Sequence, residues 1–152
     1  MKNIILISFL LFIYSCGYTS VYKTQKSKDF QINIIEMSGD NEFNNLIKNE
    51  LRMYSSENSD NKYNISIKST YQKTTISKNS AGVAIDYKLS ANTTISINFY
   101  DKVKTLEFEE SINIKNSSNS FDQNMYERNI KKNFASSIRE KFIIKIFDLN
   151  DN

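Results

Sequence analysis

One run of the sequence restricts the fold more than any other, the alternation of apolar and polar side chains from Val83 to Phe99. A period of two is the pattern of a β-strand with one buried and one solvated face. Such a strand needs only one face of its sheet covered. A strand of this length usually bends, bulges or projects past its domain, and the small residues Ser90, Ala91 and Asn92 mark where any of these could occur.

Two runs with the same period lie on either side of this strand. Tyr63 to Gln72 alternates apolar and polar positions, and so does Leu106 to Ile114, in which Glu110 takes an inward position. Phe30 to Met37 is apolar enough to form a fourth strand. The sequence therefore predicts an antiparallel meander of three strands with one additional strand beside it.

Two further stretches carry helical periodicity. Asp40 is placed to cap a helix whose apolar stripe continues to about Ser55. Ser120 and Gln123 have the spacing of a capping box, which predicts a long helix from Ser120 to about Phe147. The expected fold is an α/β (α+β) sandwich, a four-stranded, largely antiparallel sheet with two helices packed on one face, in the order β-α-β-β-β-α.

The amino-terminal segment has the layout of a secretory signal, with Lys2 ahead of an apolar run from Ile4 to Tyr14. As a helix this run would span about 16 Å, roughly half of the hydrocarbon core of a bilayer. Ile13-Tyr14-Ser15-Cys16 resembles the bacterial lipobox, which would make Cys16 the lipidated first residue of the mature chain. A plain signal peptide or an uncleaved anchor is the alternative. The expected organisation is a lipoprotein signal peptide at 1–15, a lipidated tether at 16–29 and a single domain at 30–148.

Composition removes several classes of function. The chain has no His and one Cys, which excludes a Ser-His-Asp triad, a Cys-His dyad and any metal site built from His or Cys within it. Among the strand carboxylates only Glu110 is expected to point inward. The preferred interpretation is a protein without a catalytic residue, metal or cofactor. An enzyme domain that uses Glu110 is the alternative. The formal charge of +3 gives no reason to expect a nucleic-acid partner.

The lipobox is followed by Cys16-Gly17-Tyr18, the predicted order of elements, and a last helix with Tyr126-Glu127-Arg128-Asn129 and Ala135-Ser136-Ser137-Ile138. This combination resembles the LPS-assembly lipoprotein family, LptE, over the whole chain. The resemblance implies a lipid-anchored protein on the periplasmic face of the outer membrane. It also implies that the protein plugs a large β-barrel partner (LptD-like) and takes part in delivering lipopolysaccharide to the cell surface. A periplasmic scaffold or chaperone of another envelope assembly system is the alternative.

Lysines on the expected wet strand face are candidate contacts for the phosphates of lipopolysaccharide. A solvated strand face would show the same lysines without any ligand. Aromatic residues of the predicted strands fit either core packing or a groove for acyl chains. The lysines are Lys68, Lys73, Lys78 and Lys88, and the aromatic residues are Tyr63, Tyr71, Tyr87 and Phe99.

Overall fold

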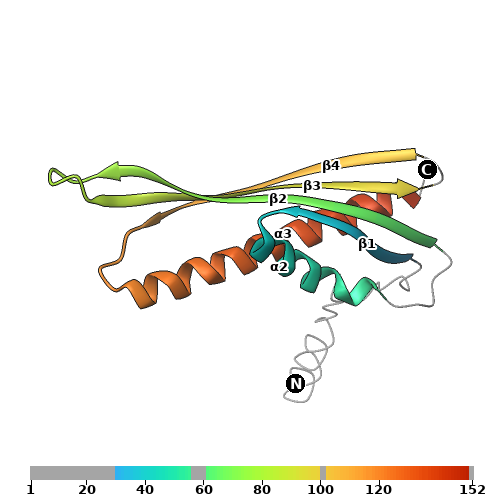
Figure 1. Ribbon diagram of the computed structural model, residues 1–152, viewed down its shortest axis with the longest axis horizontal. Helices are drawn as coiled ribbons and strands as arrows, with labels where there is room; N and C mark the ends of the chain where they lie inside the picture. Colours follow the sequence, from blue (N-terminus) through green and yellow to red (C-terminus); the bar gives the residue numbers. More distant parts are fainter. Residues whose placement is uncertain (1–29, 56–60, 100–101, 151–152) are drawn as a thin grey trace, which may run out of the picture.

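The alternating segments form a four-stranded sheet, and both helices pack against one face of it, in the order predicted from the sequence (Figure 1). This computed structural model describes residues 30–55, 61–99 and 102–150. The expected signal peptide, Cys16 and tether lie outside the described residues. The elements are β1 (Phe30–Gly39), α2 (Asn41–Leu51), the short 3-10 helix η3 (Arg52–Tyr54), β2 (Asn61–Lys78), β3 (Ala84–Phe99), β4 (Lys102–Lys115) and α3 (Ser120–Asn150).

The strands lie in the order β1-β2-β3-β4, which makes the sheet largely antiparallel, as expected. β1 is the odd strand, because it runs parallel to β2, whereas β2, β3 and β4 form an antiparallel meander. The tip of the β2–β3 hairpin extends past the amino-terminal end of α3 (Figure 1). The end of the β2–β3 hairpin therefore projects beyond the helices that cover the rest of the sheet. We call this projecting part the arm.

No bulge occurs at Ser90 to Asn92, since β3 pairs without interruption through these residues on both sides. The register shifts instead in the flanking strands, between Ile34 and Glu36 of β1 and on both sides of Ser77 in β2. An extra residue at Ser90 to Asn92 would interrupt two hydrogen-bond ladders. The observed shifts each affect one ladder, because β1 is an edge strand and because β2 has no β1 partner beyond Ser69.

The core lies between the sheet and the two helices. The inward positions of β3 from Leu89 to Ile97 are buried, including Ile95 and Ile97, and α3 contributes Ile138 and Phe142, neither of which is exposed. The Phe142 ring meets the ring of Phe108 on β4 edge to face, with 6.3 Å between centroids. Each large apolar side chain buried in this way contributes about 1.5–3 kcal/mol, so the helical stripe and the strand alternation stabilise each other.

The first turn of α2 is capped as the sequence predicts, because Asp40 Oδ1 accepts a hydrogen bond from the Phe43 amide at 2.8 Å. Gly39 precedes it with a φ of 91°, in the left-handed region that favours glycine. The Asp40 amide donates to the Ser69 carbonyl oxygen at 2.9 Å, and Ser69 Oγ donates to Asn44 Oδ1 at 2.7 Å. These contacts fasten the end of β1 and the start of α2 to the middle of β2.

The predicted capping box of α3 is wrong. Asn119 caps this helix, since its Oδ1 accepts a hydrogen bond from the Phe121 amide at 3.0 Å. Gln123 does not reach back to Ser120; its Oε1 accepts from the Ser117 amide at 2.9 Å. Asn is at least as good a cap as Ser, and here it stands one position earlier, which moves Gln123 out of the box position.

Candidate functional site

The helices lie on one side of the sheet (Figure 1), and the face opposite them is polar along nearly its whole length. We call this surface the polar face; the ladder pairing places its residues opposite one another across β2, β3 and β4, and none of them is buried. Most of the side chains are hydroxyls and amides, and Val103 at the far edge is the apolar exception. The residues are Asn64, Ser66, Lys68, Thr70, Gln72 and Thr74 of β2; Asp86, Lys88, Ser90, Asn92, Thr94, Ser96 and Asn98 of β3; and Val103, Thr105, Glu107, Glu109, Ser111, Asn113 and Lys115 of β4.

Hydrogen bonds between neighbouring strands connect parts of this polar face. Ser77 Oγ donates to Asp86 at 2.5 Å near the tip of the arm, and at the other end Asn33 of β1 donates to Asn64 at 3.0 Å. A depression of about 370 Å³ lies beside Glu107 and Glu109, which gives that part of the surface a negative character. The polar face can therefore meet a hydrated, hydrogen-bonding surface.

Two of the four candidate lysines, Lys68 and Lys88, lie on the polar face, and Lys78 lies at the end of β2, past its two register shifts. Lys68 pairs with Thr94, Lys78 with Ala84, and Lys88 with Thr74. The positions of Lys68 and Thr74 are about 20 Å apart along β2 at about 3.3 Å per residue. These lysines are consequently too far apart to hold one phosphate together, and each offers a single point charge.

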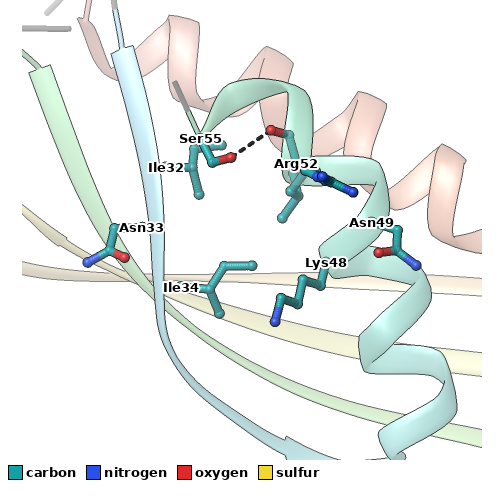
Figure 2. Close-up of a pocket in the computed structure, with 8 residues that line it drawn as sticks. Ile32, Asn33, Ile34, Lys48, Asn49, Arg52 and Ser55 are labelled. Atoms are coloured by element: carbon teal, nitrogen blue, oxygen red, sulfur yellow. Dashed lines mark hydrogen bonds between the residues drawn. The ribbon is translucent and has the colours of Figure 1, made fainter. Parts of the chain in front are cut away.

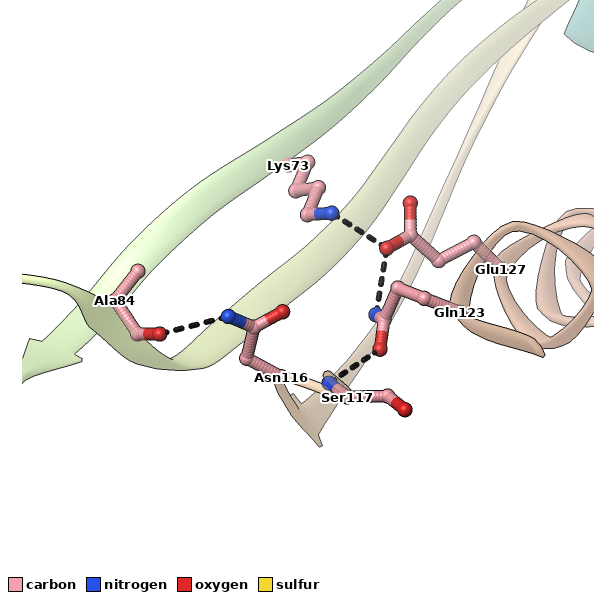
Figure 3. Close-up of polar contacts among 6 residues, drawn as sticks. All are labelled: Lys73, Ala84, Asn116, Ser117, Gln123 and Glu127. Carbon is pink, nitrogen blue, oxygen red and sulfur yellow. Dashed lines mark hydrogen bonds and ion pairs between the residues drawn. The ribbon is translucent and has the colours of Figure 1, made fainter. Parts of the chain in front are cut away.

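Lys73 belongs to the opposite face, so its grouping with the other three lysines is wrong. Its Nζ lies 2.5 Å from Glu127 Oε1 of α3 and 4.1 Å from the centroid of the Tyr87 ring. The same carboxylate oxygen accepts from Gln123 Nε2 at 2.7 Å, so Lys73, Glu127 and Gln123 form one network under the arm (Figure 3). Lys73 stands two positions after Tyr71, and the strand period turns it toward the helices with Tyr71.

The aromatic residues of the strands are packed into the core. Tyr63 is completely buried beside Phe30, with 6.1 Å between ring centroids. Tyr71 lies between Phe43, at 5.9 Å, and the Lys131 ammonium, at 4.5 Å from the ring centroid. Burial, assisted by the carboxylate of Glu127, raises the pKa of Tyr71 to about 12. This environment is that of a structural side chain, and the side chain of Phe99 lies outside the described residues.

Glu110, the candidate acid, points toward α3 as the strand period predicts. Its Oε1 accepts a hydrogen bond from Ser137 Oγ at 2.7 Å and lies 2.5 Å from Lys141 Nζ. The carboxylate side chain is only 16% exposed. Glu110 thus joins the sheet to the last helix, and in the described part of the chain no three acidic side chains come close enough to hold a metal ion.

Ion pairs between elements were not visible in the sequence. Lys131 of α3 lies 2.5 Å from Glu42 of α2, and Arg139 lies 3.5 Å from Glu50. The helical periodicity predicts only that these four charged residues lie on the exposed faces of their helices. It does not predict their partners, because the partner of a surface charge depends on how the two helices cross. Across residues 30–55, 61–99 and 102–150, no helix is long and apolar enough to cross a membrane.

The polar face, the projecting arm and the two helices define an α+β fold that is also found in solved structures of bacterial lipoproteins. The crystal structure of rare lipoprotein B from Shewanella oneidensis matches 79% of this chain and 98% of its own, with a TM-score of 0.57 and 11% identity. The solution structure of lipoprotein B from Nitrosomonas europaea matches 85% of this chain and 92% of its own, with a TM-score of 0.52 and 6% identity. A crystal structure from Caulobacter crescentus CB15 matches 82% of this chain and 93% of its own, with a TM-score of 0.58 and 9% identity.

At these identities the likeness shows a shared fold. No protein-family model and no curated protein matches the chain.

Proposed function

We propose that the protein is a lipoprotein of the LptE type, anchored by lipid on Cys16 in the periplasmic leaflet of the outer membrane. It plugs a large LptD-like β-barrel and takes part in delivering lipopolysaccharide to the cell surface. Two solved structures with this fold are named as lipoproteins, and the lipobox-like residues before Cys16 agree with an anchor of the same kind. Two or more acyl chains would hold a soluble domain firmly on a bilayer.

The observation that carries this proposal is the polar face. The interior of a large outer-membrane barrel is polar and wet, whereas its outer wall is apolar. A plug must therefore bring a hydrogen-bonding surface to the barrel wall, and Ser90, Asn92 and Thr94 at the centre of the sheet provide one. A face made of hydroxyls and amides can meet such a wall with little desolvation cost, because each donor and acceptor can be satisfied again by the partner or by bridging water.

The proposed role in lipopolysaccharide transport uses no catalytic residue. Lys68, Lys78 and Lys88 remain candidates for separate contacts with phosphates of the glycolipid, each through a single ammonium group. Lys73 is removed from this set because it is engaged with Glu127 beneath the sheet.

The first experiment is the purification of a carboxy-terminally tagged full-length protein from detergent-solubilised outer membranes, with mass spectrometry of the co-purified proteins and of the Cys16 peptide. A roughly equimolar large β-barrel protein and an acylated Cys16 are expected. Depletion of the protein should leave lipopolysaccharide in the inner membrane or periplasm. An acylated peptide without a barrel, and with normal lipopolysaccharide export, would assign the protein to another envelope assembly system.

The role of the polar face is tested by a matched pair of substitutions. Asn92→Leu places an apolar side chain at an exposed position of the polar face, and Asn129→Leu makes the same change at an exposed position of α3. We expect Asn92→Leu to reduce barrel recovery severalfold at normal protein abundance, and Asn129→Leu to leave it within about twofold of the wild type, since single exposed substitutions of this kind are tolerated by the fold. Equal recovery for both variants would contradict the proposed orientation of the plug.

A further inference from the structure

The two edges of the sheet differ in how they are protected from pairing with another strand. β4 carries charged side chains along its whole length, which is a common protection of an edge: Lys102, Lys104, Glu107, Glu109, Glu110 and Lys115. β1 has one charged residue, Glu36, and it exposes the apolar side chains of Ile35 and Met37, at 52% and 36%. The edge of β1 is therefore the one open to another strand.

A groove runs beside the first half of this edge, between β1 and α2 (Figure 2). Its volume is about 390 Å³, and it is lined by Ile32, Asn33, Ile34, Lys48, Asn49, Leu51, Arg52 and Ser55. Ile32, Ile34 and Leu51 give it an apolar floor. The groove is thus placed to receive side chains from a strand that adds to β1.

Two cations lie at this groove, Lys48 of α2 and Arg52 of the η3 turn that follows it. They are four residues apart in the chain, and both line the cavity. Neither forms an ion pair with another described residue, whereas Lys73, Lys131, Arg139 and Lys141 all have acidic partners. The groove combines an apolar floor with two positive charges that have no acidic partner among residues 30–55, 61–99 and 102–150.

We infer that the free edge of β1 binds an extended segment of a partner protein, which adds as a fifth strand next to Phe30–Ile34. On the face of this segment that meets the groove, apolar side chains enter it, and acidic side chains two positions along on the same face meet Lys48 and Arg52. The register shift after Ile34 limits regular pairing to this first half of β1. Backbone hydrogen bonds supply the affinity of such an added strand, and the groove supplies its selectivity.

Charge decides between possible occupants. A second copy of β1 would bring a single acidic residue, Glu36, which lies beyond the register shift. The chain's own segment 17–29 has three lysines and one acidic residue, so it would repel two cations. An acidic and apolar segment from a different protein fits the groove better than either of these. This inference goes beyond the proposed function, because it does not depend on which envelope machine supplies the segment.

The test uses the full-length protein in detergent and a short synthetic peptide with valine and glutamate in turn at every second position and serine between them. Both kinds of side chain then share one face of the added strand, and binding is followed by fluorescence anisotropy. The double variant Lys48→Glu/Arg52→Glu should weaken peptide binding by about tenfold or more. Arg128→Glu/Lys132→Glu is the matched control, since it reverses an exposed cation pair with the same spacing on α3. This control should bind the peptide as the wild type does.

Two modified peptides test the mode of binding. Methylation of alternate backbone nitrogens along one edge of the peptide should abolish binding, because it removes the donors that face β1, whereas methylation along the other edge should preserve it. The inference is overturned if both methylated peptides bind equally or if the Lys48→Glu/Arg52→Glu variant keeps its affinity. It is equally overturned if a valine-lysine peptide binds as well, or if the groove binds phosphatidylglycerol vesicles but no peptide.

A second copy at this edge would appear as dimerisation that Ile35→Lys abolishes, and that result would also overturn the inference. Barrel recovery with the Lys48→Glu/Arg52→Glu variant is measured separately, so a failure of the peptide assay leaves the proposed function standing.

Discussion

Alanine substitution at the two described glycines with positive φ should have very different effects. Gly39 and Gly82 have φ values of 91° and 78°, and an alanine in this region costs about 1–2 kcal/mol. At Gly82 an added Cβ has no atom within 4 Å. At Gly39 the added Cβ would overlap the Ser69 carbonyl oxygen, and backbone must move to admit it.

The magnitude at Gly39 follows from what the Ser69 carbonyl does. It accepts the Asp40 amide at 2.9 Å, directly before the cap of α2, so its displacement costs a further 1–3 kcal/mol, roughly that of an unsatisfied buried group. We expect Gly39→Ala to lower the free energy of unfolding by about 2–5 kcal/mol. Gly82→Ala should cost about 1 kcal/mol, since alanine also reduces the entropy of the unfolded chain.

Thermal unfolding followed by circular dichroism measures the difference. At about 4 °C per kcal/mol for a domain of this size, Gly39→Ala should lower Tm by about 8–20 °C and Gly82→Ala by about 4 °C. If the two variants unfold within about 3 °C of each other, the close approach of β1 to β2 at Ser69 is not the reason for the glycine, and the reasoning fails.

Three further predictions concern single side chains. Asp40→Ala should cost about 1 kcal/mol through loss of the α2 cap, and Asp40→Asn should retain nearly all of it, as measured by urea unfolding. Burial raises the pKa of Tyr71 from its ordinary value of 10 to about 12, so the stabilisation linked to this shift is complete below pH 10 and is lost as the pH rises toward 12. Tyr71→Phe should remove the part of the alkaline decline in Tm that comes from this side chain. An unchanged slope of Tm against pH would contradict this assignment. Glu110→Gln should cost about 1–2 kcal/mol by weakening the contacts with Ser137 and Lys141, and cellular function should fall only as far as protein abundance does; a larger loss at normal abundance would favour the enzyme alternative.

The fold could be predicted because the informative residues act locally. The alternation that ends in Ile95 and Ile97 sets which face of β3 is buried, and the same period in β2 and β4 sets the faces of its neighbours. Asp40 was identifiable as a cap from its position alone. The capping box at Ser120 failed because two good caps stand within two residues, and the sequence does not show which amide each one reaches.

The candidate site was harder to predict because it depends on distances across the sheet. Counting positions from Tyr71 would have placed Lys73 on the side of the sheet that faces the helices. The sequence around Lys73 does not show that Glu127 of α3 lies beside it. The spacing between Lys68 and Lys88 follows only from the register of the hairpin, which fixes Lys88 opposite Thr74. The groove at Lys48 and Arg52 depends on β1 lying at the edge of the sheet, which the sequence order does not determine.

The parallel pairing of β1 with β2 also has a consequence for the order in which the chain folds. The hairpins from β2 to β4 join neighbours in the sequence and can form early, at low cost in loop-closure entropy. β1 can pair only after the chain has crossed over through α2, and α3 must return to α2 from the far end of the domain. The meander is then a template on which the first strand is placed late, and this order leaves the outer edge of β1 among the last surfaces to be completed during folding.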